Sequence, residues 1–304
     1  MSCFIFGWIP DIPDLRDYSE DTTSVREIMA ATRLRPRRAS PRAVQGNRPK
    51  RASGSFPAAV DLRAHCSPVE DQGNLGSCTA NAGAGIIEYY ERRAFGRHLD
   101  ASRLFLYKAA RNLMKIKGDT GAYLRTTIGA MVLFGVPPEE HWPYDDGPGR
   151  FDREPPAFCY AFAQNYKTIQ YYRHDIPGMP AAETLERVKA HLESGHPSMF
   201  GFTVYSSIES ADARGAIPFP GPKERIEGGH AVVAVGYDDR IMIKNGKNGG
   251  KETTGALLIR NSWGKGWGDG GYGWLPYEYV VRGLAEDFWS VLKKDWIDTG
   301  AFNE

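Results

Sequence analysis

The sequence of 304 residues lacks the patterns that mark membrane, zinc and nucleotide-binding proteins. It has no run of about 18 apolar residues, so an ordinary membrane-spanning helix is excluded. Its four cysteines include no CxxC pair, and no two histidines have the helical spacing of metal ligands. It contains no phosphate-binding glycine loop and no GxSxG nucleophile elbow. The sequence therefore predicts a protein without a metal, a cofactor or a membrane partner.

Cysteine is too scarce for the disulfide framework that stabilises small secreted proteins. Cys3, Cys66 and Cys159 are expected to be small, semi-buried apolar side chains. The apolar stretch 3–9 has no basic residue before it and no small-residue cleavage site after it, so no secretory signal peptide is predicted. These features favour a cytoplasmic location, with export by a non-classical route as the alternative.

Net charge is nearly absent, since 38 basic residues face 37 acidic ones. This balance hides a basic strip, because residues 33–51 contain eight Lys or Arg and no acid, which leaves the rest of the chain at −7. Residues 33–55 also hold three prolines and few large apolar side chains, so an exposed linker is predicted. Nucleic-acid binding is the less favoured interpretation, because no aromatic residues lie among the arginines.

The sequence does contain a change of pattern near residue 165. With 41% hydrophobic and 25% charged residues it has the composition of a folded globular protein. Helices are predicted at 77–95, 102–115, 122–134 and 183–194, and a short one within 11–32 carries a Ser24–Glu27 capping box. Strands are predicted at 198–205, 230–237, 240–244 and 256–261, with a hairpin connection at 245–250 and a loop at 142–156. A helical half followed by a strand-rich half predicts an α+β fold of two lobes with a cleft between them.

Three segments carry side chains suited to nucleophilic catalysis. Residues 72–78 read QGNLGSC and place Cys78 directly before the longest helical pattern. A thiol at a helix N-terminus faces unpaired N–H groups, which favour the thiolate. His230 follows two glycines at the start of a predicted strand, and Asn261 lies in the sequence RNSWG. Together they supply a nucleophile, a base and an amide that orients the base, a complete set for acyl transfer.

The same segments resemble the motifs of papain-family cysteine peptidases. The family's QGSCGSCW corresponds to QGNLGSCT, its DHAVAAVGY to GGHAVVAVGY, and its KNSWGTGWGENGY to RNSWGKGWGDGGY. The likeness extends over about residues 57–290 and is greatest for a compact bacterial branch of the family. It implies the papain-like two-lobed α+β fold, with a helical left lobe, an antiparallel β-barrel-like right lobe and the active-site cleft between them.

The resemblance implies a cysteine endopeptidase that acts on peptides or proteins. Cys78 would attack the scissile carbonyl, and His230 would form an ion pair with the thiolate and then protonate the leaving amine. Asn261 would orient His230, and Trp263 would shield their contact from water. Gln72 would donate its side-chain amide to the oxyanion, beside the backbone N–H of Cys78.

The resemblance also implies how a substrate is held. An extended peptide would pair through its backbone with a wall of the cleft, as a strand pairs with the edge of a sheet. The substrate-binding residues would be Gly121, Ala122, Tyr123, Leu124, Ala231, Trp263 and Asp287. Because Asp287 would form the floor of the second subsite, arginine is expected to be accepted two residues before the cut.

Two departures from the family pattern concern packing. The family joins two cysteines at the positions that Leu75 and Asp119 occupy here, so that disulfide cannot form. Its absence fits a protein that need not meet an oxidising compartment. Thr79 stands where the family has a tryptophan after the nucleophile, which alters local packing and leaves the chemistry intact.

The chain is expected to divide into an N-terminal segment and a catalytic domain. The segment comprises residues 1–55 and the domain residues 56–304, with a helical lobe at about 77–165 and a β-rich lobe at about 166–304 plus 56–71. Residues 1–32 are expected to dock near the cleft as an inhibitor, and the Arg/Pro-rich linker is expected to be the processing site. The alternative is an extension that only packs on the body or is disordered. A monomer is expected, with no nucleic-acid partner.

Two other functions are compatible with the same fold. A transferase or transglutaminase-like enzyme would use the same nucleophile, but the Asn261 amide and its NSWG context argue against it. An inactive papain-like binding module held shut by its N-terminus is the second alternative. The complete catalytic set argues against that function.

Overall fold

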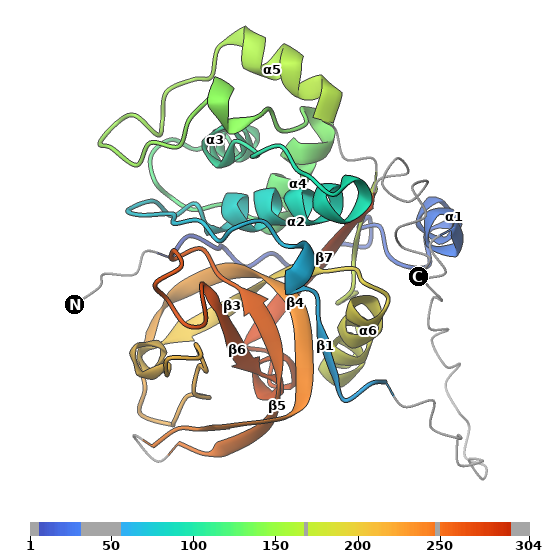
Figure 1. Cartoon of the computed structure of the whole chain (residues 1–304), viewed down its shortest axis with the longest axis vertical. Coiled ribbons are helices and arrows are strands. Elements are labelled where there is room, and N and C mark those ends of the chain that lie inside the picture. Colours follow the sequence, from blue (N-terminus) through green and yellow to red (C-terminus); the bar gives the residue numbers. More distant parts are fainter. Residues whose placement is uncertain (1–5, 32–55, 167–169, 247–249, 293–304) are drawn as a thin grey trace.

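The structure, a computed structural model, describes residues 6–31, 56–166, 170–246 and 250–292. Helices gather at one end of the molecule and an antiparallel sheet lies at the other (Figure 1). The predicted two-lobed α+β architecture is confirmed. Cys3 and the linker predicted at 33–55 lie outside the described residues.

Residues of the caps fix the start of α3 and the end of α2 in the helical lobe. The Ser102 hydroxyl accepts a hydrogen bond from the Phe105 N–H at 3.2 Å and so caps α3. Gly96 ends α2 in the left-handed conformation, with φ 72°, which glycine adopts without a Cβ clash. The α-helices of this lobe are α2 (Cys78–Phe95), α3 (Arg103–Met114), α4 (Leu124–Leu133) and α5 (Ala157–Ala163).

The other lobe is built on one antiparallel sheet. Its strands lie in the order β2–β7–β3–β4–β5–β6, and β1 pairs with β4. The sheet comprises β1 (Ala59–Asp61), β2 (Gln170–Arg173), β3 (Ser198–Tyr205), β4 (Ile226–Lys244), β5 (Glu252–Arg260), β6 (Tyr272–Pro276) and β7 (Ala285–Leu292). Two further helices of this lobe are α6 (Ala181–Glu193) and α7 (Tyr277–Val281).

The central strand β4 joins the two cores of the molecule. Ala231, Val233 and Val235 belong to the buried cluster that contains α2. Val232 and Ala234 alternate with them and belong to the cluster that contains residues of α6. Because successive side chains of a strand point to opposite faces, this apolar run is buried on both sides. The histidine that precedes it is therefore held on a rigid element between the lobes.

Most predicted elements are confirmed, and the differences have local causes. The strands predicted at 230–237 and 240–244 form one strand, β4, whose register with β5 shifts between Asp238 and Met242. The predicted Ser24 cap is wrong: α1 (Thr23–Ala31) starts one residue earlier, and the Arg26 N–H donates to the Thr22 carbonyl. Ser24 instead accepts a hydrogen bond from Gln170. Strands β2, β6 and β7 and helices α5 and α7 were not predicted, because each is short or lacks a clear period.

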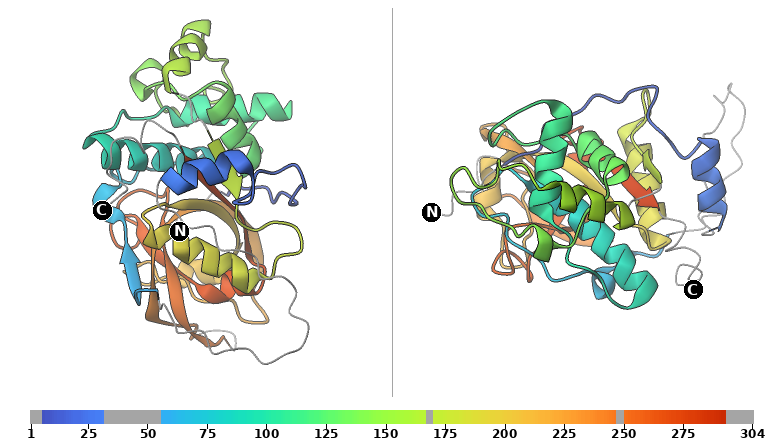
Figure 2. Two further views of the ribbon diagram at one scale, coloured as in Figure 1. Left: turned by 90° about the vertical axis from the view of Figure 1, so that its right-hand side faces the viewer. Right: turned by 90° about the horizontal axis from the view of Figure 1, so that it is seen from above.

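Residues 6–31 lie along the body of the molecule. Figure 1 shows this segment in dark blue, passing between the helices and the sheet before it reaches α1, and Figure 2 shows α1 from two other sides. Helix α1 buries Val25 and Met29 in one cluster with Tyr172 of β2 and Leu292 of β7. The N-terminal segment is therefore an integral part of the folded structure.

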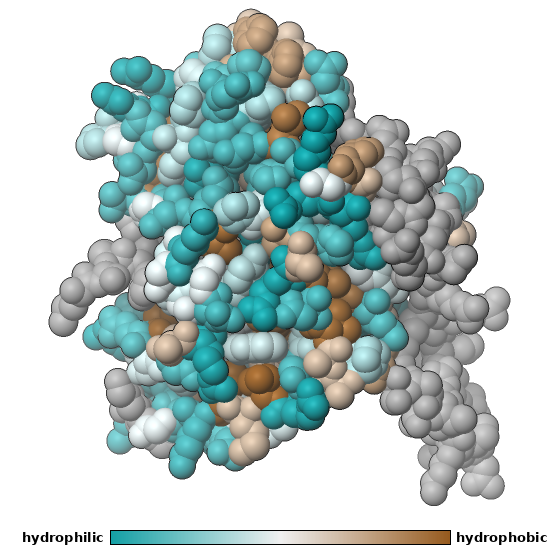
Figure 3. Space-filling model, viewed as in Figure 1, coloured by the Kyte–Doolittle hydropathy of each residue, from teal (hydrophilic) through white to brown (hydrophobic). Residues whose placement is uncertain are grey.

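The surface offers no extended apolar face in the view of Figure 3, where hydrophilic residues predominate and apolar ones are scattered. Exposed large apolar residues such as Ile12 and Leu15 occur singly along the N-terminal segment. Among the described residues no helix combines the length and the apolar character needed to cross a membrane.

Candidate active site

The candidate nucleophile begins the longest helix of the helical lobe. Cys78 is the first residue of α2, and the loop before it carries Gln72. The Cys78 side chain is fully buried. Its Sγ accepts a hydrogen bond from the Ala231 N–H at 3.4 Å, which places the thiol beside the residue that follows His230. The fold thus brings together two segments that lie 153 residues apart in sequence.

The candidate base is oriented by two neighbours. Nε2 of His230 lies 2.7 Å from Oδ1 of Asn261, and since an amide oxygen only accepts, Nε2 carries the hydrogen. The indole of Trp263 stacks on the imidazole with ring centroids 4.6 Å apart and planes 24° apart. Within the described residues the buried Nδ1 of His230 has no hydrogen-bond partner. This nitrogen is the one left to take a proton from the thiol.

Gln72 is tied to the loop that carries the orienting asparagine. Its Nε2 donates to the Leu75 carbonyl at 2.8 Å, and its Oε1 accepts from the Ser262 hydroxyl at 2.6 Å. The Gln72 backbone N–H also donates to the Ser262 carbonyl at 2.8 Å. These bonds fix the nucleophile loop against the residue after Asn261. Cys78, His230, Asn261 and Gln72, all predicted from the sequence, therefore meet at one place.

The cleft wall predicted at Gly121 and Ala122 is paired with the chain's own N-terminus. The Ala122 N–H donates to the Gly7 carbonyl at 2.8 Å, and the Ile9 N–H donates to the Ala122 carbonyl at 3.2 Å. Gly121 must be small here, because a Cβ on it would lie 2.1 Å from the Gly7 oxygen. On the opposite side the Trp8 N–H donates to the Gly229 carbonyl at 2.9 Å. Residues 7–9 thus fill the position of an extended peptide.

The residue before this pairing lies against the candidate base, His230. The ring of Phe6 lies edge-on to His230 and to Trp263, with centroids 6.1 Å and 6.2 Å away. Gly7 follows at van der Waals distance from the nucleophile loop, where a Cβ on it would lie 1.8 Å from the Gly76 oxygen. The sequence predicted that residues 1–32 dock near the cleft but did not identify Phe6 or Trp8. No motif marks them, and only the tertiary contacts show their place.

Of the remaining predicted subsite residues, Asp287 contacts Trp8 directly. Its indole Nε1 donates to Oδ2 of Asp287 at 3.2 Å, and Asp287 is fully buried. Leu124 and Ala231 belong to the same buried cluster as Trp8. Tyr123 is half-buried at the start of α4, where its carbonyl accepts the Thr127 N–H. Of the predicted subsite residues, Gly121, Ala122 and Asp287 are therefore the ones for which a direct contact with residues 7–9 is observed.

Burial changes the acid–base properties of the pair. It raises the pKa of the Cys78 thiol to about 11, even though backbone N–H groups partly oppose the shift. Burial also lowers the pKa of His230 to about 4, although the hydrogen bond to Asn261 acts to raise it. Both shifts favour a neutral thiol and a neutral imidazole in this covered arrangement. The ion pair predicted from the sequence needs a more hydrated cleft.

Comparison with known proteins agrees with this geometry. The sequence profile of the papain family cysteine proteases matches residues 56–287, which include all four candidate catalytic residues. The chain belongs to the papain family. It is therefore a cysteine peptidase, a hydrolase of peptide bonds.

Similar proteins cover nearly the whole chain. An uncharacterised peptidase C1-like protein of Acanthamoeba polyphaga mimivirus is 34% identical over 294 residues, or 94% of this chain and 86% of the viral protein. Cathepsin K of Gallus gallus is 30% identical over 260 residues, or 84% of this chain and 70% of the cathepsin. Among solved structures, xylellain, a cysteine protease from Xylella fastidiosa, matches with a TM-score of 0.70 at 34% identity. The match covers 95% of this chain and 96% of the xylellain chain.

Asp119, which stands where the resemblance implies a cysteine in the family, makes hydrogen bonds instead. The carboxylate of Asp119 accepts the Gly76 N–H at 2.9 Å and the Tyr107 hydroxyl at 2.5 Å. The Tyr107 oxygen in turn accepts the Gly121 N–H at 3.1 Å. One carboxylate therefore connects the nucleophile loop to the cleft wall. The sequence offered only the paired loss of two cysteines as a signal for it.

The N-terminal segment of the peptidase is also held by ion pairs beyond the cleft. Arg125 of α4 donates to the Ile12 carbonyl at 2.9 Å and to the Asp17 carboxylate at 2.8 Å. Arg173 of β2 donates to the Asp11 carbonyl at 3.1 Å. Both arginines belong to the body, so these contacts hold the part of the segment that follows its crossing of the cleft.

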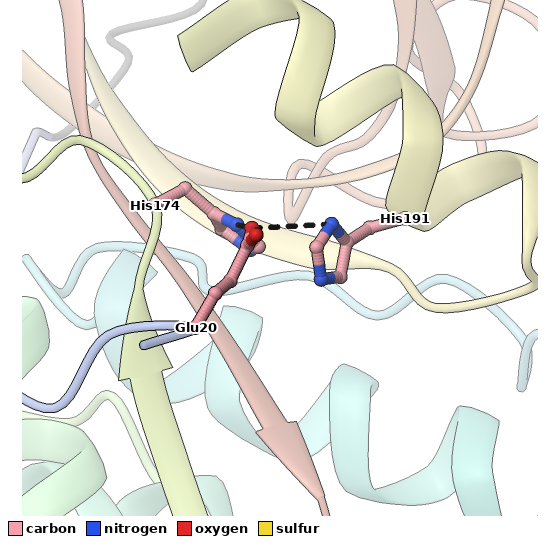
Figure 4. A group of neighbouring side chains, drawn as sticks. All are labelled: Glu20, His174 and His191. Carbon is pink, nitrogen blue, oxygen red and sulfur yellow. Dashed lines mark hydrogen bonds and ion pairs between the residues drawn. The ribbon is translucent and has the colours of Figure 1, made fainter. Parts of the chain in front are cut away.

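A third anchor is a buried group of three residues that resembles a metal site (Figure 4). Oε1 of Glu20 lies 3.4 Å from Nδ1 of His174 and 3.7 Å from Nδ1 of His191. However, Nδ1 of His191 lies 2.8 Å from the Arg187 carbonyl, which can only accept, so that nitrogen carries a hydrogen and offers no lone pair. The Arg187 guanidinium lies 3.9 Å from Glu20 and supplies positive charge. The contacts favour an ion-pair anchor over a metal centre.

A second carboxylate group is likewise neutralised by an arginine. Glu70, Asp100 and Glu139 lie close enough to share an ion. The guanidinium of Arg103 lies 2.9 Å from Glu70 and 2.9 Å from Glu139. Because this cation already pairs with two of the carboxylates, the group fixes α3 to the loop before α2, which carries Glu70, and to the short turn after α4, which carries Glu139.

Proposed function

We propose that Cys78, His230, Asn261 and Gln72 are the catalytic residues of this cysteine peptidase. The Cys78 thiolate adds to the scissile carbonyl carbon, and the Gln72 amide and the Cys78 backbone N–H bind the oxyanion. His230 gives its proton to the leaving amine, which leaves a thioester on Cys78. His230 then takes a proton from the water that hydrolyses the thioester. The observation that carries this proposal is the 2.7 Å contact between His230 and Asn261, since a base oriented by a third group is what the chemistry requires.

The substrate is proposed to bind where residues 6–9 lie now. The proposed lining comprises Gly121, Ala122, Tyr123, Leu124, Ala231, Trp263 and Asp287. Backbone pairing with Ala122 supports this path, because an extended peptide gains affinity from main-chain hydrogen bonds and selectivity from one side-chain pocket. A monomer remains the expected state of the enzyme.

The N-terminal segment, assigned to residues 1–55, is proposed to inhibit the catalytic domain of residues 56–304. In the chain direction Phe6 lies by His230 and Trp8 lies in the second subsite. A substrate would run in the opposite direction. Its residue in the second subsite comes before the cleaved bond in sequence, whereas Trp8 comes after Phe6. The parallel bridge between Trp8 and Ala122 fits this reversed direction. A peptide bound backwards fills the cleft without presenting a bond for cleavage.

Inhibition is proposed to act on the chemistry as well as on access. In the covered cleft burial raises the pKa of Cys78 to about 11, although the Gly7 backbone N–H partly opposes the shift, and burial lowers the pKa of His230 to about 4. Displacing residues 6–9 would admit water and restore the field of the α2 N-terminus at the sulfur. The thiolate can then form, so opening the cleft also activates the nucleophile.

The test uses three forms of the full chain. They are the parent, the double variant Phe6→Ser/Trp8→Ser (the open variant), and the open variant with Cys78→Ala. We expect the open variant to hydrolyse a fluorogenic peptide and to be labelled stoichiometrically at Cys78 by an epoxide inhibitor of papain-like peptidases. The parent should react much more slowly, and the Cys78→Ala form should not react.

A matched control is Leu15→Ser, because Leu15 lies in the same segment and is 92% exposed. It should behave as the parent does. If the open variant neither hydrolyses peptides nor is labelled, the proposed catalytic function is wrong and an inert binding module is favoured. If the parent is already as active as the open variant, the inhibitory role of the segment is wrong.

A further inference from the structure

The pocket that holds Trp8 is shaped for a flat ring. The indole is 5% exposed, and it lies against the backbone of two glycines on neighbouring strands, Gly201 of β3 and Gly229 of β4. A Cβ on Gly201 would lie 1.9 Å from the indole Cε2, and one on Gly229 would lie 2.8 Å from Cε3. Any larger residue at these positions would close the slot. Because paired residues of antiparallel strands point to the same face of a sheet, as do residues two apart on one strand, the two glycines form one flat wall against which the indole lies.

The inner end of the slot presents one available acceptor. Oδ1 of Asp287 accepts the Trp289 indole N–H at 2.6 Å and lies 3.1 Å from the Arg173 guanidinium. Oδ2 accepts the Trp8 indole N–H at 3.2 Å. Asp287 and Arg173 are both fully buried. One oxygen is thus committed to the body, and the other faces the occupant of the pocket.

The carboxylate is held in place by an unusual backbone conformation. Asp287 has φ 65°, in the left-handed region that residues other than glycine seldom adopt. The Asp175 carboxylate stabilises it by accepting the Asp287 N–H at 2.7 Å and the Phe288 N–H at 2.8 Å. Such strain persists where surrounding contacts enforce it, and it is typical of functional positions. Here it fixes where Oδ2 points.

We propose that this pocket selects tryptophan at the substrate residue two before the cut, because the slot fits an indole and Asp287 accepts its N–H. This inference rests on the proposed function, in which substrates occupy the path of residues 6–9. This proposal replaces the preference for arginine that the sequence predicted. That prediction rested on the charge of Asp287 alone and not on its contacts with neighbouring side chains.

The structure distinguishes tryptophan from its competitors. A guanidinium carries five N–H donors, and this buried slot offers it one acceptor oxygen next to the existing Arg173, so most of its donors would lose their water without replacement. Leucine or phenylalanine would leave Oδ2 buried without a donor. A site built to hydrogen-bond an occupant discriminates strongly against analogues that lack the donor.

The first test uses the pocket's own occupant in the full chain. Trp8→Phe, Trp8→Leu and Trp8→Arg are compared with the parent by the rate at which iodoacetamide alkylates Cys78, located by mass spectrometry. We expect alkylation to be about tenfold or more faster in the Leu and Arg variants, with Phe between them and the parent. If Trp8→Arg or Trp8→Leu protects Cys78 as well as tryptophan does, the proposal is wrong. This arm needs no catalytic activity.

The second test uses substrates and the open variant. Peptides that differ only in Trp, Phe, Leu or Arg two residues before the cut are compared by kcat/KM. Tryptophan should exceed leucine and arginine by about tenfold or more. A preference for arginine or leucine would overturn the inference and leave the peptidase function intact. Absence of any hydrolysis would contradict the proposed function, and the alkylation series would still decide the preference of the pocket.

A matched pair of substitutions tests the slot itself. Gly201→Ala places a methyl group in the ring space, so the advantage of tryptophan over leucine in the open variant should fall severalfold. Gly129→Ala is the control, because a Cβ there meets no atom within 4 Å. An unchanged preference in Gly201→Ala, in a protein that melts at the parent temperature, would show that the slot does not determine selectivity.

Discussion

The carbonyl oxygen of Gly7 accepts a hydrogen bond from the Ala122 N–H at 2.8 Å. This contact joins the seventh residue of the chain to the wall of its own catalytic cleft. From it the segment extends to Phe6 at the histidine and to Trp8 in the side pocket. Residues 6–8 thus cover the cleft.

A methyl group at Gly7 should open the cleft. The Cβ of Gly7→Ala would lie 1.8 Å from the backbone oxygen of Gly76, which cannot move without shifting the nucleophile loop. We expect epoxide labelling of Cys78 in the full chain to be about tenfold faster than in the parent, because roughly 1.4 kcal/mol of lost docking corresponds to that ratio. Leu15→Ala, on the exposed part of the segment, is the control. Equal labelling rates in both variants would contradict the close approach.

Asn261 should matter for turnover more than for binding. Removing its amide in Asn261→Ala leaves His230 without the 2.7 Å contact that orients the ring. In the open variant we expect kcat to fall on the order of 10²-fold with a small change in KM, since acid–base catalysis contributes about that much. Asn165→Ala, an exposed asparagine on the surface, should have no effect. A normal kcat in Asn261→Ala would remove it from the catalytic set.

Asp119 is expected to act as a positioning residue. Asp119→Ala removes the acceptor shared by the Gly76 N–H and the Tyr107 hydroxyl, so the nucleophile loop loses its tie to the wall. We expect kcat/KM of the open variant to fall about tenfold, in line with the loss of about 1.4 kcal/mol of preorganisation. Asp119→Asn keeps one acceptor oxygen and should recover part of the activity. Failure of Asn to recover more activity than Ala would argue that the carboxylate does not position the loop.

The ionised Glu20 carboxylate is expected to stabilise the folded state in a pH-dependent way. Burial would raise its pKa, but the hydrogen bond from His174 and nearby positive charges lower it to about 2. A carboxyl with a depressed pKa stabilises the folded state above its ordinary pKa, and this stabilisation is lost as the pH falls toward the folded value. Glu20→Gln should therefore lower the free energy of unfolding by roughly 3 kcal/mol at pH 7, and by about half of that or less at pH 3.

Urea unfolding at the two pH values measures that difference. The control is Glu27→Gln, because Glu27 lies on the exposed side of α1. It should change the free energy of unfolding little at either pH. A Glu20→Gln effect of the same size at pH 7 and pH 3 would show that the ionised carboxylate is not what anchors the segment.

The candidate catalytic residues could be identified from the sequence because local motifs carry them, and the structure brings them together. Cys78 lies at the start of the longest helical pattern, and His230 and Asn261 lie in glycine-rich contexts that no structural role requires. The two-lobed fold followed from a change of period along the chain. These signals are short in range, so one sequence is enough to recognise them.

The contents of the cleft could not be predicted in the same way. The bond between Trp8 and Asp287 joins residues 279 apart, and nothing in either local sequence refers to the other. The sequence indicated a docked segment from its length and composition, but the residues that enter the cleft depend on tertiary contacts. The contact between Arg173 and Asp287 could not be predicted from the sequence either. Because this contact already supplies a guanidinium to the carboxylate, it changes which side chain we expect in the pocket.

The most direct test of the account is the rate of iodoacetamide alkylation at Cys78 in the full chain, compared with the open variant Phe6→Ser/Trp8→Ser at neutral pH. Cys66 and Cys159 are buried free thiols in the body and serve as internal standards. The account predicts that alkylation of Cys78 is about tenfold or more faster in the open variant, while that of Cys66 and Cys159 is unchanged. Equal rates at Cys78 in the two proteins would contradict the claim that residues 6–9 cover the catalytic pair.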